Sequence, residues 1–390
     1  MKICFVVQRY GLEVNGGAEL HCRQLAEHMA DRCQVTVLTT KAVDYITWEN
    51  VYTQETEELH GVTVRRFGVS RPRDMEEFNR INREFAEGRV KSREREMEWL
   101  MKQGPHVPEL LKYLSDEKDH YDAFIFFTYL YYPTAMGVEL VSDKAIVIPT
   151  AHEEPFLEMS IYRSVFCSPK AIFYNTVEER FLAELVFDNR NIRNEIGGVG
   201  VECPPVVSAE AFKEKYGLDD YVLYVGRIDQ GKGCDKLFAF WKAYKACVNT
   251  SLKLVLMGKA VIDVPVRDDI VNLGFVSDQD KFDGMSGAMC LVLPSQYESL
   301  SMVVLESLQL GTPVVVNGQC EVLAGHCLRS NAGLYYTNYG EFVGSLEYLR
   351  THETERTIMG ELGKDYVKKN YRWDVITGKL EQLIYFVERG

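Results

Sequence analysis

The chain has 390 residues, 46% of them hydrophobic and 26% charged, which is ordinary for a globular protein of about two domains. The net charge of -13 is spread over both halves, since residues 1–200 alone hold 24 basic and 32 acidic side chains. This balance excludes nucleic acid as a partner, because phosphate backbones require concentrated Lys and Arg. No apolar run suits a signal peptide or reaches the roughly 18–20 residues of a membrane span, so we expect a cytoplasmic protein.

Ten cysteines are scattered along the chain, and none forms a Cys-x-x-Cys pair. We expect buried, reduced thiols rather than a disulfide framework or a zinc site.

In the first half, short apolar runs rich in β-branched residues alternate with helical patterns, which is typical of βαβ units and a parallel sheet. The expected strands are Lys2–Val7, Gln34–Thr39, Val62–Phe67, Ala123–Phe127, Ala145–Ile148 and Ala171–Tyr174. The expected helices are Ala18–Ala30, a long charged helix over Met75–Gln103, and Thr176–Phe187.

The second half restarts the same alternation after a linker rich in Gly and Pro. The expected strands are Tyr221–Val225, Leu252–Met257, Ile270–Leu273, Cys290–Leu293 and Pro313–Val316, and the expected helices are Lys236–Cys247, Ser301–Leu310 and Tyr339–Leu349. We therefore predict an α/β protein with doubly wound, Rossmann-like domains at 1–200 and 206–372. Their strands would end at a cleft between them, where such sheets bind ligands.

A glycine-rich turn follows the first strand of the second domain. It nearly matches a P-loop, but Gly233 stands where that motif requires Ser or Thr to hold magnesium, which disfavours a nucleotide hydrolase. Arg227 and Lys232 remain on the turn, either as two ordinary surface cations or as a pair suited to a departing diphosphate.

A second motif follows the strand Cys290–Leu293. Ser299 and Ser301 occupy positions expected for helix N-caps, where free backbone N–H groups attract a sugar hydroxyl or a phosphate. Glu306 lies in the apolar helix that follows, where a carboxylate needs hydrogen-bond donors, either ribose hydroxyls or a structural Arg.

Together these segments resemble family 4 of the group 1 retaining glycosyltransferases, which have the GT-B fold. The resemblance rests on the acid pair Glu298 and Glu306, on the turn carrying Arg227 and Lys232, and on Asn15 to Glu19 in the first loop. It implies two domains facing across a cleft, with a last helix, residues 373–390, crossing back onto the first domain.

The resemblance also implies roles for individual residues. Arg227 and Lys232 would bind the diphosphate, Glu306 the ribose, and Glu298 the donor-sugar hydroxyls. The other donor-binding residues would be Gly16, Gly17, Ser299, Leu300 and Ser301, and His152 would lie near the donor sugar. After His152 this chain has Glu153 where the family often has Asp; a structural His is the alternative for His152.

Two further motifs have plainer interpretations. The Asp-x-Asp sequence at Asp278–Asp280 would start a helix with Asp278 as its cap rather than bind a metal, and the preceding loop at Phe275 and Val276 would contact the nucleobase. No Gly-x-Gly-x-x-Gly follows the first strand, which disfavours a nicotinamide site.

The aromatic residues Tyr129, Tyr131 and Tyr132 follow a strand and would either stack on an acceptor or pack in the core. The segment Trp99–Pro108 would help to shape the acceptor pocket.

The predicted activity is therefore metal-independent, retaining transfer of a hexose-type sugar, with no cofactor, as in polysaccharide biosynthesis. The donor would be a nucleotide sugar, UDP- or GDP-linked, and the acceptor a glycan, a lipid-linked sugar or a small molecule. The alternatives are a sugar-nucleotide epimerase, a phosphorylase or a non-catalytic nucleotide-sugar-binding protein. Family analogy allows peripheral attachment at the inner face of a membrane, although the acidic amino-terminal half does not support it.

Overall fold

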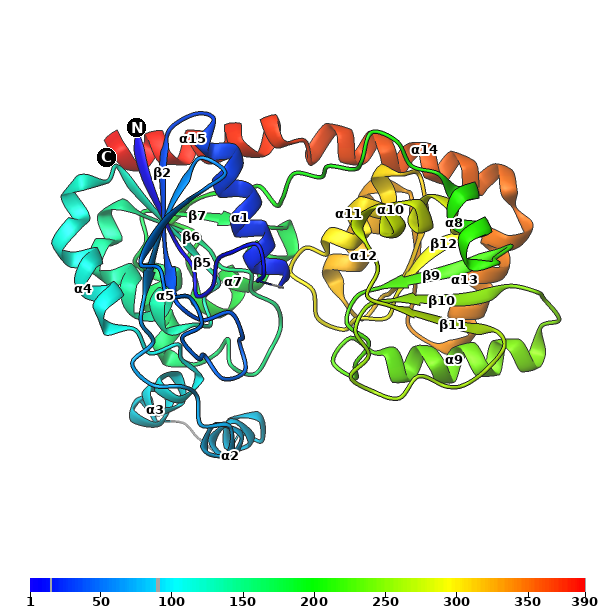
Figure 1. Ribbon diagram of the computed structural model, residues 1–390, viewed down its shortest axis with the longest axis horizontal. Coiled ribbons are helices and arrows are strands. Elements are labelled where there is room, and N and C mark those ends of the chain that lie inside the picture. The colour runs from blue at the N-terminus through cyan, green and yellow to red at the C-terminus, as the bar shows by residue number, and fades with distance from the viewer. Residues whose placement is uncertain (15, 89–91, 390) are drawn as a thin grey trace. The chain divides into compact units, whose positions relative to one another are not determined.

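The computed structural model describes residues 1–14, 16–88 and 92–389, which form two compact units. Unit 1 comprises residues 1–199 and 373–390, and unit 2 residues 200–372 (Figure 1). Each unit is a mainly parallel sheet with helices on both faces. The ten cysteines form no disulfide, and among the described residues every helix is too short or too polar to serve as a membrane span.

The sheet of unit 1 has the order β3-β4-β2-β1-β5-β6-β7-β8, and only the β3–β4 pair is antiparallel. Its central strands are buried on both faces because helices cover both, so they are almost entirely apolar. The strands are β1 (Lys2–Val6), β2 (Gln34–Thr40), β3 (Thr56–Leu59), β4 (Val62–Phe67), β5 (Ala123–Phe127), β6 (Ala145–Ile148), β7 (Ala171–Tyr174) and β8 (Arg193–Ile196).

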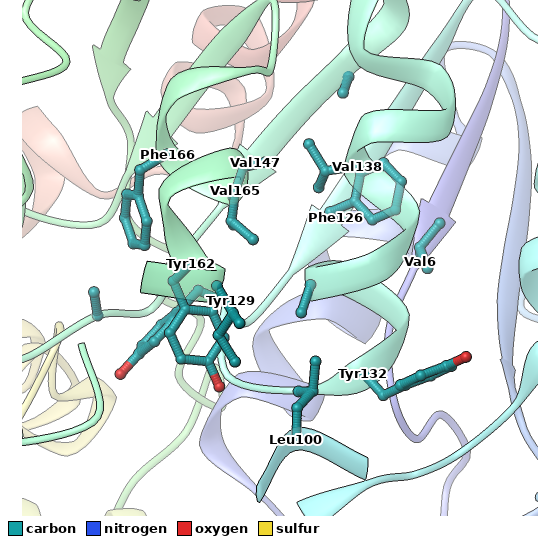
Figure 2. Packing of buried hydrophobic residues seen from close by; sticks show 14 of the residues in the cluster. Val6, Leu100, Phe126, Tyr129, Tyr132, Val138, Val147, Tyr162, Val165 and Phe166 are labelled. Atoms are coloured by element: carbon teal, nitrogen blue, oxygen red, sulfur yellow. The ribbon is translucent and has the colours of Figure 1, made fainter. Parts of the chain in front are cut away.

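Helices α1 and α15 contact each other on one face of this sheet, and α4, α5 and α6 enclose a hydrophobic core on the other (Figures 1 and 2). The α-helices of unit 1 are α1 (Gly17–Ala30), α2 (Met75–Ala86), α3 (Arg93–Gln103), α4 (Pro108–Glu117), α5 (Tyr132–Gly137), α6 (Arg163–Cys167), α7 (Val177–Phe187) and α15 (Trp373–Arg389). Short 3₁₀ helices lie at Lys118–His120, Val138–Lys144 and Ser160–Tyr162.

The expected long helix over Met75–Gln103 is wrong, because it is two helices. Helix α2 ends before Gly88, which has a left-handed φ of +67°. Helix α3 then has its own N-cap, Ser92, whose side chain accepts a hydrogen bond from Arg95 N at 3.3 Å. Residues 89–91 of the expected helix lie outside the described residues.

Helix α15 returns the chain to unit 1, as the resemblance implied. Its apolar side buries Ile376, Leu380 and Leu383, which recur at helical spacing. The Trp373 ring stacks on His28 of α1 with centroids 4.1 Å apart, and Lys379 donates a 2.7 Å hydrogen bond to the carbonyl of Ile196.

The sheet of unit 2 is fully parallel, with the order β11-β10-β9-β12-β13-β14. Its strands are β9 (Tyr221–Val225), β10 (Lys253–Met257), β11 (Ile270–Gly274), β12 (Cys290–Leu293), β13 (Val314–Asn317) and β14 (Gly333–Tyr336). Its helices are α8 (Ala209–Tyr216), α9 (Cys234–Cys247), α10 (Asp278–Gly287), α11 (Met302–Gln309), α12 (Glu321–Ser330), α13 (Tyr339–Thr351) and α14 (Glu353–Asn370). In Figure 1, α9 lies on one face of this sheet and α10 and α11 on the other.

Candidate active site

The strand order of unit 2 brings two loops together at its topological switch point. Strands β9 and β12 are neighbours, and the connections that leave them run to opposite sides of the sheet. The loop after β9 holds Gly233, whose φ is +74° and whose Cβ, if present, would lie 2.6 Å from the carbonyl oxygen of Pro294 after β12. Because a side chain at Gly233 would collide with backbone, glycine is required for the two loops to touch.

These two loops are joined by an ion pair between predicted site residues. Lys232 Nζ lies 2.7 Å from Glu298 Oε1, and about a third of the lysine side chain remains exposed. A partly exposed pair of this kind is worth at most about 1 kcal/mol. Lys232 can therefore exchange Glu298 for an incoming anion at little cost.

Asp229 organises the glycine-rich turn. Its Oδ1 accepts a 2.7 Å hydrogen bond from the backbone of Lys232, and its Oδ2 pairs with Nε of Arg227. The carbonyl of Arg227 accepts a 2.7 Å hydrogen bond from Tyr224 Oη, while nearly half of the arginine side chain is exposed. The turn thus presents both predicted cations from a fixed backbone.

The N-terminus of α11 forms the other side of this site. Ser301 is its N-cap residue, but φ is +66° and its side chain makes no capping hydrogen bond. Among the described residues, the buried Oγ atoms of Ser301 and Ser295 have no hydrogen-bond partner. Ser299 and Leu300 precede the cap, and the first N–H groups of α11 follow it. Unpartnered donors at a helix N-terminus suit a phosphate or a sugar hydroxyl.

A buried histidine fixes the loop that carries these serines. His326 of α12 lies 2.8 Å through Nε2 from the carbonyl oxygen of Leu300, and its Nδ1 lies 3.1 Å from Tyr366 Oη. Because the carbonyl only accepts, Nε2 carries the proton and Nδ1 accepts from the tyrosine. Burial lowers the pKa of His326 to about 4. The sequence reasoning missed His326, since no local motif marks it.

Glu306 lies one turn further along α11. Its Oε1 accepts a 2.9 Å hydrogen bond from Lys281 of α10, so the structural donor is a lysine and not the arginine considered as the alternative to ribose hydroxyls. Burial raises the pKa of Glu306, and the neighbouring Lys281 charge opposes that rise. Among the described residues only Oε1 is engaged, which leaves Oε2 available to hydroxyl donors.

The loop between β11 and α10 holds the predicted nucleobase contacts. Phe275 is 84% exposed, and Val276 beside it is half-buried. Ser277, not Asp278, caps α10, since its Oγ accepts a 3.1 Å hydrogen bond from Asp280 N. Serine reaches the third amide from this position, which corrects the cap by one residue. The Asp280 carboxylate pairs with Lys215 at 2.8 Å.

In unit 1, the glycine-rich loop lies on a buried ion pair that the sequence reasoning missed. Arg9 donates to Glu19 Oε1 through Nη2 at 2.7 Å and Nε at 3.0 Å. A Cβ on Gly16 would lie 2.1 Å from Glu19 Oε2, whereas one on Gly17 would meet nothing within 4 Å. A side chain at Gly16 would therefore displace the buried Glu19 carboxylate, whereas one at Gly17 would not. Asn15 lies outside the described residues.

His152 follows β6 in a segment held by the buried carboxylate of Glu179. The two Glu179 oxygens accept backbone hydrogen bonds from Ala151 at 2.6 Å and Asn175 at 2.5 Å, joining the ends of β6 and β7. Desolvation raises the pKa of Glu179 to about 8. His152 itself is half-buried, with Nδ1 3.8 Å from Glu154 Oε1. The sequence reasoning missed Glu179. A capping-box pattern, Thr176 followed three residues later by Glu179, could have identified this glutamate from the sequence.

Two of the three predicted acceptor tyrosines are core residues. Tyr129 is 1% exposed and Tyr132 6%, and both pack among apolar side chains in Figure 2. Tyr129 Oη also donates a 2.5 Å hydrogen bond to Glu154. Their rings have no free face for stacking on a sugar, which disfavours the acceptor role. Tyr131 is half-buried and contacts Trp48 edge-on, with centroids 5.4 Å apart.

The two doubly wound units, with α15 returned to unit 1, define the GT-B fold, and solved structures share it. Sucrose-phosphate synthase from Thermosynechococcus elongatus is similar with a TM-score of 0.72 and 16% identity, covering 99% of this chain and 98% of that one. HepE from Anabaena, in complex with UDP-glucose, has a TM-score of 0.68 and 15% identity, covering 98% and 99%. At these identities the likeness shows the fold.

Residues 208–364 match the family model described as "Glycosyl transferases group 1". This match confirms the resemblance to group 1 glycosyltransferases over that part of the chain, and family 4 within that group stays a prediction.

Curated relatives match parts of the chain. An uncharacterized glycosyltransferase of Methanocaldococcus jannaschii is 27% identical over 180 residues, which is 42% of this chain and 45% of the relative. An alpha-D-kanosaminyltransferase of Streptomyces kanamyceticus is 34% identical over 124 residues, 27% of this chain and 31% of the relative. The chain thus spans less than half the length of each of these relatives.

Proposed function

We propose that this protein is a retaining glycosyltransferase that moves a hexose-type sugar from a nucleotide-diphosphate donor to a glycan or lipid-linked acceptor. The observation that carries the proposal is the 2.7 Å contact between Lys232 and Glu298, which joins the two motif loops at the switch point of unit 2. The match of residues 208–364 supports the same activity. HepE, which has the same fold, binds UDP-glucose, which favours a UDP-sugar as donor.

Each predicted residue has a defined task in this reaction. Arg227 and Lys232 would stabilise the departing diphosphate, together with the N–H groups of α11, because negative charge grows there as the bond breaks. These protein charges would do what a divalent metal does in other transferases. Glu298, once released by Lys232, would accept hydrogen bonds from donor-sugar hydroxyls, and Glu306 Oε2 would accept them from the ribose.

The reaction breaks the bond between the anomeric carbon and the diphosphate oxygen and forms one between that carbon and an acceptor oxygen. The acceptor attacks from the face that the diphosphate leaves, and the leaving phosphate oxygen takes the acceptor proton. The resemblance to retaining enzymes supports this front-face route. An NMR spectrum of the product with an inverted anomeric centre would exclude it.

A panel of UDP-, GDP-, ADP- and CMP-sugars tests the proposal. We expect one donor class to raise the melting temperature and to be hydrolysed slowly without acceptor. A sugar-nucleotide epimerase would instead convert the donor sugar without releasing nucleotide, and a phosphorylase would require inorganic phosphate. Donor binding without any turnover would favour a non-catalytic binding protein.

A further inference from the structure

Unit 1 contains a cavity of about 240 Å³ at the carboxyl-end side of its sheet. It lies between the segments that follow β2 and β4 and the end of α3, and its lining includes Trp48, Arg71, Arg73 and Lys102. Gly104, which also lines it, accepts a 3.2 Å hydrogen bond from the backbone of Tyr132. The cavity therefore borders the loop after β5, one of the two loops at the switch point of unit 1.

The carboxylates that line this cavity already have partners. Asp74 caps α2 and accepts hydrogen bonds from the backbones of Glu76 and Glu77, both at 3.0 Å. The Glu77 side chain pairs with Lys102, which also lies 3.9 Å from Glu98. These three acids therefore neutralise a helix N-terminus and one lysine, and no other cation of the cavity.

Arg73, by contrast, has only neutral partners. Its Nε and Nη2 each donate to Gln103, to the carbonyl and the side-chain oxygen respectively, at 3.0 Å. Its guanidinium carbon lies 5.1 Å from the Trp48 ring centroid and 4.6 Å from that of Phe78. Within the described chain it forms no ion pair, and Nη1 has no acceptor. Asp44 acts on it electrostatically, but Asp44 Oδ2 is engaged by backbone amides of its own turn.

Burying a guanidinium without an anion is costly, and burial lowers the pKa of Arg73 to about 10. A second cation adds to the positive field: Arg71 is exposed and likewise forms no ion pair with any described residue. Burial, and after it the Arg71 charge, lowers the pKa of His106. The cavity thus combines a fixed, partly unsatisfied guanidinium with an exposed one. An oxyanion satisfies both.

We propose that this cavity binds an anionic group, a carboxylate or a phosphate, carried by the acceptor sugar, with Arg73 and Arg71 as its ligands. The inference rests on the proposed transferase activity and adds the class of acceptor. The cavity is lined by residues of unit 1, whereas the predicted diphosphate ligands belong to unit 2, so we assign it to the acceptor.

The test compares glucose, glucuronate and glucose 6-phosphate as acceptors for the full-length protein. We expect the wild type to prefer a charged acceptor over glucose. Because a hydrogen bond to a charged group is worth about 1.5–3 kcal/mol, Arg73→Gln should lower that preference about ten- to a hundredfold. Arg71→Gln, at an exposed position, should lower it less, and the Arg73→Lys variant should recover only part. Arg80→Gln, an exposed arginine of α2 outside the cavity, is the matched control and should keep the preference.

Equal efficiency with all three sugars, or equal losses for charged and neutral acceptors in Arg71→Gln and Arg73→Gln, would overturn the inference. If Arg73→Gln does not fold, two other measurements decide the inference. One is the acceptor preference of Arg71→Gln, and the other is the binding of glucose 6-phosphate or glucuronate to the wild type, measured by ligand-observed NMR against glucose. Retained donor hydrolysis without a charge preference removes only this inference. Absence of both hydrolysis and transfer removes the proposed function itself.

Discussion

At the scale of single residues, Lys232 is the side chain on which the proposed chemistry depends most. It is held by Asp229 through its backbone and by Glu298 through its ammonium, and it stays a third exposed. Lys232→Ala should lower kcat roughly 10²–10³-fold, the usual loss for one donor to a developing oxyanion, with an unchanged melting temperature. Lys236→Ala, at an exposed position on α9, is the control. Full activity of Lys232→Ala would show that the site is assigned wrongly.

In the proposed reaction, Glu306 would serve donor binding rather than chemistry. Its removal would take away the acceptor for ribose hydroxyls and leave Lys281 without its partner. Glu306→Ala should weaken binding of the free nucleoside diphosphate by roughly ten- to a hundredfold, as calorimetry would measure, since a hydrogen bond to a charged group is worth about 1.5–3 kcal/mol. Glu210→Ala, an exposed glutamate of α8, should bind as the wild type does. Unchanged affinity in Glu306→Ala would remove the ribose assignment.

At the scale of elements, the loop between β12 and α11 owes its conformation to the neutral His326. Its pKa is lowered from 6.5 to about 4, so the unfolded chain binds a proton more readily than the folded one in that interval. Stability is therefore complete above pH 6.5 and falls as the pH drops towards 4, by up to about 3 kcal/mol. His21 of α1 shows the same shift and contributes in unit 1.

Urea unfolding between pH 7.5 and 4.5 checks this contribution. His326→Gln keeps an amide donor for the Leu300 carbonyl but cannot take up a proton, so its stability should vary less with pH than that of the wild type. The same variant should keep a KM for the donor closer to normal than His326→Leu, which has no donor. Parallel pH profiles for wild type and His326→Gln would contradict the prediction.

The central strands were predictable from sequence, whereas of the edge strands in the described sheets only β11 was predicted. Buried parallel strands such as β1 and β12 are uninterrupted apolar runs, so their positions follow from composition. Strands β3, β8 and β14 were missed because they lie at sheet edges, where exposed faces permit polar residues such as those of Thr56–Leu59.

The residues of the candidate site were likewise predictable only in part. The motif residues of unit 2 could be named because glycines, cations and acids recur there in a recognisable order. The partners Lys281 and His326 could not, because they reach the site from other helices and only tertiary packing brings them near Glu306 and Leu300. Arg73 was not predicted as a site residue for a similar reason, because only the folded structure shows that it has no counter-ion among the described residues.

At the scale of the whole molecule, unit 1 depends on α15. This helix buries an apolar stripe on unit 1 and ties to it through the Arg32–Glu381 ion pair at 2.7 Å and the Lys379 contact with Ile196. Ending the chain at Arg372 should expose that stripe and destabilise unit 1 strongly, by more than a single core substitution does. Hydrogen exchange should show lost protection in β5 to β8 and retained protection in β9 to β14. Equal protection of unit 1 in both forms would refute this.

Because α15 follows unit 2 along the chain, unit 1 begins first during synthesis but is completed last. Residues 1–199 emerge first, but the surface that α15 covers stays exposed to water until all of unit 2 has been translated. At roughly 5–20 residues per second, this leaves an apolar groove open for many seconds on a growing polypeptide. We therefore expect nascent unit 1 to be prone to aggregation, whereas unit 2 can close once its last helix, α14, has left the ribosome.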